Sequence, residues 1–134
     1  YENRFLMVVL DFNLPSASRI LLAVSDDSNP NGTWYMTAIN SLLTISSEPR
    51  FADYPGLSVD EEAVYISANM FGVSSGIFVD SRIWVVRKKV SAAGGFYFGG
   101  GVTAKLLDPL PPPFPIEIPD SRRRASVGAI RGPG

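Results

Sequence analysis

The feature that most constrains the fold is the segment of residues 19–36, RILLAVSDDSNPNGTWYM. An apolar run leads into a polar stretch rich in Asp and Asn, and an aromatic run beginning Thr33-Trp34-Tyr35 follows. Two β-prone runs joined by a stretch that contains Asn31-Gly32, the preferred pair for a tight turn, are typical of a β-hairpin. The segment predicts two antiparallel strands and indicates an all-β chain.

Further β-branched and aromatic runs follow the same pattern along the chain. They predict strands at residues 4–12, 19–25, 33–39, 42–46, 63–71, 77–88 and 96–106. Residues 51–56, FADYPG, are predicted to form a turn or an irregular extended segment, because Pro55 disfavours helix at Tyr54 and Gly56 frees the backbone. No stretch predicts a helix of ten or more residues. Trp34 and Trp84 are the strongest core candidates.

The composition excludes several classes of chemistry. The 134 residues include no cysteine and no histidine, so the chain has no disulfide, no Cys/His zinc site, no thiol nucleophile and no histidine acid–base catalyst. The net charge of −1 gives no bias toward nucleic acid. No apolar run approaches the roughly 20 residues of a membrane-spanning helix. We expect neither nucleic acid nor a membrane span among its partners.

The C-terminal part of the sequence differs in composition from the rest. Residues 110–115, LPPPFP, cannot lie inside a helix or a central strand, and Arg-, Gly- and Ala-rich sequence follows Pro119. We therefore expect residues 1–108 to form the folded part. Residues 109–134 are expected to form an extended Pro-rich arm and a basic, poorly ordered tail.

Four segments occur in the order RFLMVVLDF, SRILLAVSDDSNPNGTWYMTAI, FADYPGLSVDEEAVYISANMF and SRIWVVRKK. In combination they resemble blades of the sialidase-like bacterial β-propellers. The resemblance implies antiparallel, four-stranded, blade-like sheets. At roughly 40–50 residues a blade, residues 1–108 cover about two blades, whereas closed propellers have about four to eight. Three possibilities follow: a fragment of a longer propeller, several copies that together close a ring, or a small β-sandwich with two packed sheets in place of blades. Ser25-Asp26-Asp27 and Gly32-Thr33-Trp34 supply the elements of an Asp-box turn with altered spacing, a structural turn in that family.

Two functions follow as hypotheses. The first is a non-catalytic structural or recognition module of an exported or cell-surface protein, without a cofactor. The alternative is a fragment of a sialidase-like, glycan-acting enzyme, for which the nearby carboxylates of Asp53, Asp60, Glu61 and Glu62 would supply the acid–base pair. Because no spacing marks a catalytic pair, the first hypothesis is favoured.

Three residues of the blade-like motifs are predicted to bind a ligand, a carbohydrate or a protein: Asp53, Tyr54 and Asn69. Asp26, Asp27 and Asn29, with Asn31, offer oxygen atoms suited to Ca²⁺ but lack the spacing of a calcium loop. Such residues in a hairpin turn usually bond their own backbone, which is the favoured interpretation.

The β-strands of an isolated pair of blades would leave apolar faces and edges open. We therefore predict self-association, or contact with neighbouring blades of the same protein. The faces involved are predicted to carry Phe5, Met7, Leu21, Ile66 and Val85.

Overall fold

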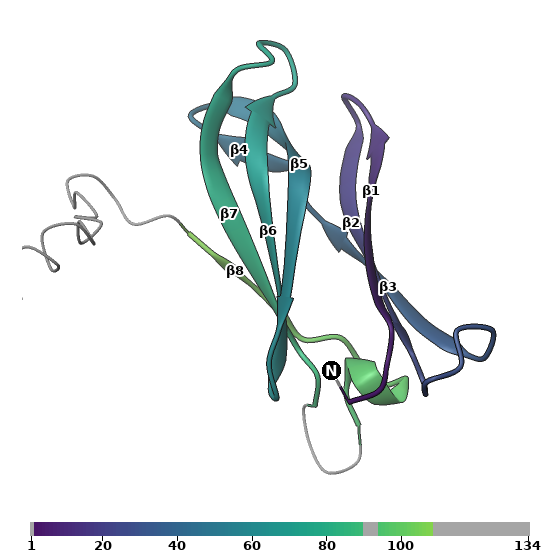
Figure 1. The fold of residues 1–134 in the computed structure, drawn as a ribbon. Helices are drawn as coiled ribbons and strands as arrows, with labels where there is room; N and C mark the ends of the chain where they lie inside the picture. The colour runs from purple at the N-terminus through teal and green to yellow at the C-terminus, as the bar shows by residue number, and fades with distance from the viewer. Residues whose placement is uncertain (1, 90–93, 109–134) are drawn as a thin grey trace, which may run out of the picture.

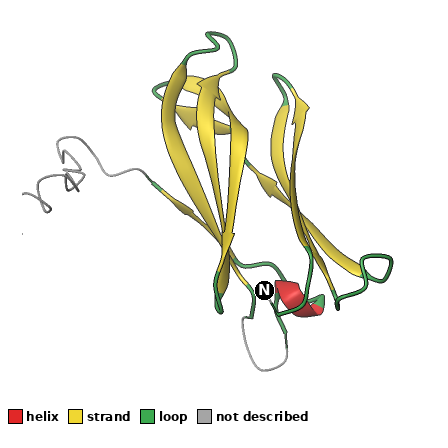
Figure 2. Cartoon of the chain, viewed as in Figure 1, coloured by secondary structure: helices red, strands yellow, loops and turns green. Residues whose placement is uncertain are grey.

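The computed structural model describes residues 2–89 and 94–108, and in these ranges the chain is built from antiparallel strands (Figures 1 and 2). The first sheet, sheet A, has three strands in the order β1-β2-β3. The second, sheet B, has five in the order β4-β5-β6-β7-β8. The strands are β1 (Leu6–Asn13), β2 (Ala17–Ser25), β3 (Trp34–Asn40), β4 (Leu43–Ile45), β5 (Glu48–Val59), β6 (Ala63–Gly72), β7 (Phe78–Arg87) and β8 (Ala104–Leu107).

The predicted all-β, antiparallel architecture is confirmed, and the sheets are curved in a way compatible with a propeller blade. The strands divide three and five between the sheets rather than four and four. The reason is that β4 pairs with β5 and not with β3, so the chain passes from sheet A to sheet B immediately after β3. The predicted arm and tail, residues 109–134, lie outside the described residues.

The two sheets face each other, and the core lies between them (Figure 1). Clean alternation in β6 places Val64, Ile66, Ala68 and Met70 inside, opposite Ile20, Leu22 and Val24 of β2. Trp84 is buried in this core, as predicted. Trp34 was wrongly predicted to lie in the core: the β2–β3 register places it, like Met36, on the side of sheet A that faces away from sheet B, where it is partly buried and its ring packs on Phe5.

Residues 51–56 form an irregular extended segment, one of the two predicted forms: they belong to β5, which stays paired with β6 by means of a bulge between Asp53 and Gly56. Another local prediction is wrong. Residues 96–106 are not a continuous strand: Phe96–Phe98 form the short 3₁₀ helix η1 at the end of the core, and only Ala104–Leu107 form β8. Phe96 and Tyr97 are both buried there.

Candidate functional site: the outer faces of the two sheets

The polar loop of the β2–β3 hairpin is held together by its own side chains. Asp26 N donates to Thr33 O (3.0 Å), which closes a loop longer than a tight turn, with Asn31-Gly32 inside it. Asp27 Oδ1 accepts from Asn29 N (2.7 Å), and Asn29 Oδ1 accepts from Asn31 N (3.1 Å). These oxygens cap the loop, as the favoured interpretation of the sequence predicted.

Two observations bear on the hypothesis that this loop binds Ca²⁺. Asp26 Oδ1 is buried without a hydrogen-bond partner among the described residues, but the neighbouring oxygens are engaged with backbone amides. In residues 2–89 and 94–108, no group of three or more acidic side chains is arranged to hold a metal ion. Ser25 joins the loop to the segment just before β1 by accepting from Phe5 N (2.8 Å) and donating to Asp27 O (2.6 Å).

The carboxylate of Asp60 is also engaged in a turn, between β5 and β6. Its Oδ1 accepts from the amides of Glu62 and Ala63 (both 2.8 Å), and its Oδ2 accepts from the Tyr65 hydroxyl (2.7 Å). The Tyr65 bond, followed by the two amide bonds, lowers the pKa of Asp60. A carboxylate held ionised by turn amides suits a structural role better than proton donation.

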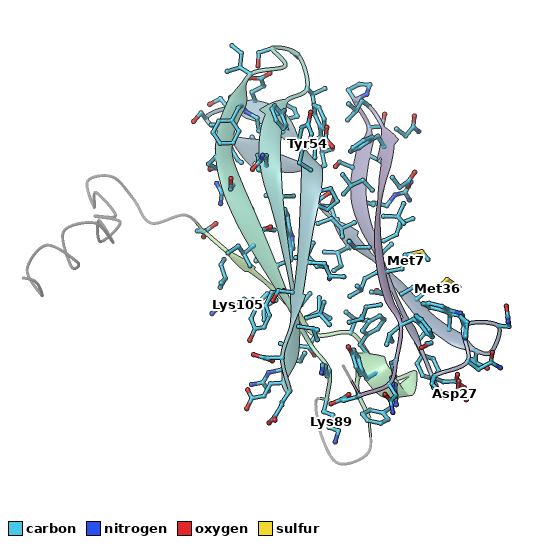
Figure 3. All side chains as sticks on the ribbon, in the orientation of Figure 1. Met7, Asp27, Met36, Tyr54, Lys89 and Lys105 are labelled. Carbon is cyan, nitrogen blue, oxygen red and sulfur yellow. The ribbon has the colours of Figure 1, made fainter. Side chains whose placement is uncertain are left out.

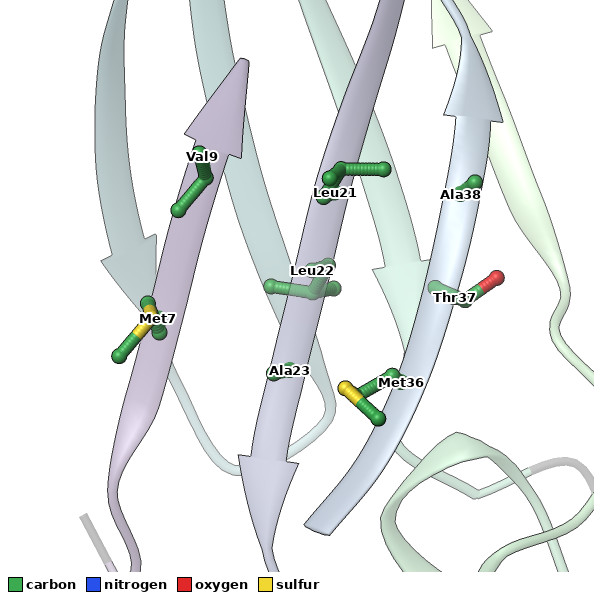
Figure 4. A pocket seen from close by; sticks show the side chains of 8 residues that line it. All are labelled: Met7, Val9, Leu21, Leu22, Ala23, Met36, Thr37 and Ala38. Atoms are coloured by element: carbon green, nitrogen blue, oxygen red, sulfur yellow. The ribbon is translucent and has the colours of Figure 1, made fainter. Parts of the chain in front are cut away.

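The outer face of sheet A is apolar over two complete rows of cross-strand neighbours. The strand register aligns Met7, Ala23 and Met36 in one row and Val9, Leu21 and Ala38 in the next. These six residues are called here the apolar face. Together with Leu22 and Thr37 they line a hollow of about 460 Å³, in which Ala23 and Ala38 are the smallest side chains (Figure 4). Met36 is 77% exposed and Met7 53% exposed.

The apolar face is bounded by an aromatic pair at one end and by a polar row at the other. At one end lies the Phe5–Trp34 ring pair, with centroids 6.5 Å apart. At the other lies a polar row in which Arg19 Nε and Asp11 Oδ2 are 2.9 Å apart and Asn40 is the third member. Figure 3 shows Met7 and Met36 on the side of sheet A that points away from sheet B. An extended apolar surface with a charged rim is typical of an interaction surface.

The residues predicted for self-association are only partly on exposed surfaces. Phe5, Met7 and Leu21 are exposed on sheet A, and Val85 is half-buried on the outer face of sheet B. Ile66 was wrongly predicted to lie on such a face: it is fully buried in the core between the sheets. The burial of Ile66 could have been predicted from the sequence, because Ile66 lies between the more polar residues Tyr65 and Ser67 in an alternating strand pattern.

The residues predicted to bind a ligand are brought together on the outer face of sheet B. Asp53 of β5 and Asn69 of β6 are cross-strand partners. Tyr54 follows at the bulge and is 71% exposed, and its position is labelled in Figure 3. Ser81 was not among the predicted residues, because only the β6–β7 register brings it beside Asn69, where its Oγ donates to Asn69 Oδ1 (2.7 Å).

No protein-family model matches the chain, and no curated protein or solved structure matches it either. Within the described ranges, no helix is long and apolar enough to span a membrane.

Proposed function

We propose that the chain is a non-catalytic structural or recognition module of an exported or cell-surface protein of the β-propeller type. In this proposal the apolar face of sheet A packs against another β-sheet, and for the isolated chain that sheet belongs to a second copy. The observation that carries the proposal is the two-row apolar face bounded by the Asp11–Arg19 pair. The sialidase-like blade motifs of the sequence agree with it.

The arrangement of large and small side chains on the apolar face supports a second copy of the chain as its binding partner. In the row Met7–Ala23–Met36 the small residue is central, whereas in the row Val9–Leu21–Ala38 the large residue is central. A two-fold arrangement places the same patch on both partners. Leu21 of one copy then fills the recess over Ala23 of the other, and the exchange is reciprocal.

The charged rim bounds the interface in this arrangement. Arg19 and Asp11 remain roughly half exposed although they are paired. Because the exchange of Leu21 and Ala23 reverses the strand direction of the second copy, the two charged rims lie at opposite ends of the interface, each beside the Phe5–Trp34 end of the other copy. The six residues of the apolar face carry no charge that would oppose burial.

Sedimentation velocity over a concentration series tests the proposal. The wild-type chain is expected to dimerise, and Met36→Lys is expected to weaken the dimer about tenfold or more, since a buried unpaired charge is costly. Val102→Lys is the matched control, because Val102 is an exposed apolar residue outside sheet A. A wild-type chain that stays monomeric at every concentration would overturn the proposal.

A further inference from the structure

The outer face of sheet B differs in character from the apolar face of sheet A. The registers of β5 to β8 define four rows across it, called here the mixed face. They are Ser58–Tyr65–Val85–Lys105, Gly56–Ser67–Ile83–Leu107, Asp53–Asn69–Ser81 and Phe51–Phe71–Phe78. The polar row Asp53–Asn69–Ser81 thus lies between the aromatic row and the row that contains the small residues Gly56 and Ser67. A face that combines polar and aromatic rows suits a polar ligand better than the apolar face of another sheet.

The polar row offers hydrogen bonds of both kinds. Asp53 Oδ1 accepts from Tyr54 N (2.7 Å), and among the described residues its second oxygen has no partner. Asn69 Oδ1 is used by the Ser81 hydroxyl, which leaves the Asn69 amide NH₂ as a donor. A carboxylate acceptor beside an amide donor suits a hydroxyl group, which donates and accepts at once.

An exposed aromatic ring lies next to these groups. Tyr54 packs on Phe71 with ring centroids 6.1 Å apart, and Phe71 contacts Phe51 and Phe78 at 6.0 and 5.9 Å. The backbone of Tyr54 has φ of 52°, in the left-handed region that bulky residues rarely adopt. The β5 bulge holds it there. Strain of this kind is concentrated at functional positions.

On the other side of the polar row the mixed face is hollowed. Gly56, Ser67, Tyr65 and Ile83 line a depression of about 320 Å³. A side chain at Gly56 would fill part of it, since a Cβ there would lie 2.5 Å from Ser67 Oγ. Neighbouring rows on one face of a sheet are roughly 7 Å apart, so the aromatic ring, the polar row and the hollow together fit an oligosaccharide rather than a single sugar.

We propose that the mixed face of sheet B is a carbohydrate-binding site for a neutral glycan, with Tyr54 stacking on a sugar ring and Asp53 and Asn69 bonding its hydroxyls. Asp53 is the acidic residue of the four rows, and the basic residue, Lys105, lies two rows away from it. An anionic glycan would therefore meet a carboxylate where it needs a cation. The site shares no residue with the apolar face, so it stands independently of the proposed dimer.

Affinity gel electrophoresis of the full chain tests this site, with laminarin, arabinoxylan and galactomannan as neutral probes and alginate as the anionic control. At least one neutral polysaccharide is expected to retard the wild type. Tyr54→Ala should weaken binding roughly tenfold and Asn69→Ala roughly fivefold, whereas Tyr54→Phe should retain it. Met36→Lys, on the apolar face, is the control for a change remote from the site.

Three results would overturn the inference: no retardation by any neutral probe, retardation by alginate alone, or retardation that Tyr54→Ala and Asn69→Ala both leave intact. Near-UV circular dichroism checks that each variant is folded. Because Tyr54 is mostly exposed, its replacement is not expected to disturb the core. Loss of dimerisation in Met36→Lys with glycan binding retained would separate this inference from the proposed self-association.

Discussion

Ser18 and Ser41, both fully buried, hold their hydroxyl oxygens 2.9 Å apart where sheet A meets sheet B. Ser18 Oγ also accepts from Ala52 N (3.3 Å). The pairing of β4 with β5 ends at Arg50, so this hydroxyl takes the place of a strand partner for the Ala52 amide. The junction between the sheets thus depends on a polar pair inside an apolar core.

Replacement of Ser18 by Ala is expected to destabilise the fold by about 1–3 kcal/mol, because the buried amide of Ala52 loses its partner. Urea unfolding followed by tryptophan fluorescence measures the free energy of unfolding. Ser28→Ala, at an exposed loop position, is the control and should change it by less than about 0.5 kcal/mol. Equal effects of the two substitutions would show that the Ser18 hydroxyl does not join the sheets.

Gly99 ends η1 in the left-handed conformation, with φ of 72°, and a Cβ there would lie 2.9 Å from Tyr35 Cε1. Gly99→Ala should therefore lower the free energy of unfolding by about 1–3 kcal/mol. Gly101→Ala is the matched substitution two residues away, where a Cβ meets no atom within 4 Å. It should be nearly neutral. A thermal melt compares them, and a harmless Gly99→Ala would argue against this placement of η1 on Tyr35.

The buried hydroxyl of Tyr97 predicts a loss of stability at alkaline pH. Burial above all, and the charge of Glu2, raise the pKa of Tyr97 to about 12, from the ordinary value of 10.0. The unfolded chain therefore releases this proton at lower pH than the folded chain does. The stability contribution is fully present below pH 10 and is lost as pH rises toward 12.

Tyr97→Phe is expected to remove this dependence, so the difference in urea midpoint between variant and wild type should grow from pH 9 toward pH 12. All other ionisable groups are the same in both proteins and cancel in the difference. Val102→Ala, which changes an exposed residue without an ionisable group, is the control and should differ from the wild type by a constant amount. A constant difference across the range would contradict the assignment.

The sequence predicted strands well where alternation and turn chemistry agree. The hairpin of β2 and β3 and the alternation of β6 follow from local pattern alone. The β5 strand was missed because Pro55 and Gly56 resemble a turn locally, whereas pairing with β6 absorbs them in a bulge. The 3₁₀ helix was missed because it lies against β3, a strand about 60 residues earlier in the sequence, where Gly99 closely approaches Tyr35.

The faces of the sheets were harder to predict than the strands. In β1 the run LMVVL is apolar on both sides, so alternation cannot tell Leu6 and Val8, which are partly buried against the core, from the exposed Met7 and Val9. Asp53, Tyr54 and Asn69 could be selected from sequence motifs, but Ser81 required the cross-strand register. Pairings between distant strands are long-range information that one sequence does not carry.

The absence of cysteine allows the central claim, self-association through the apolar face, to be tested by a single introduced thiol. Ala23→Cys lies at the centre of the apolar face, and Ser67→Cys lies at the matching position on the mixed face. Because Leu21 of the second copy covers position 23, Ala23→Cys should react with a thiol reagent more and more slowly as the protein concentration rises, whereas Ser67→Cys should react at the same rate at every concentration. A reaction rate of Ala23→Cys that does not change with concentration would contradict the proposed interface.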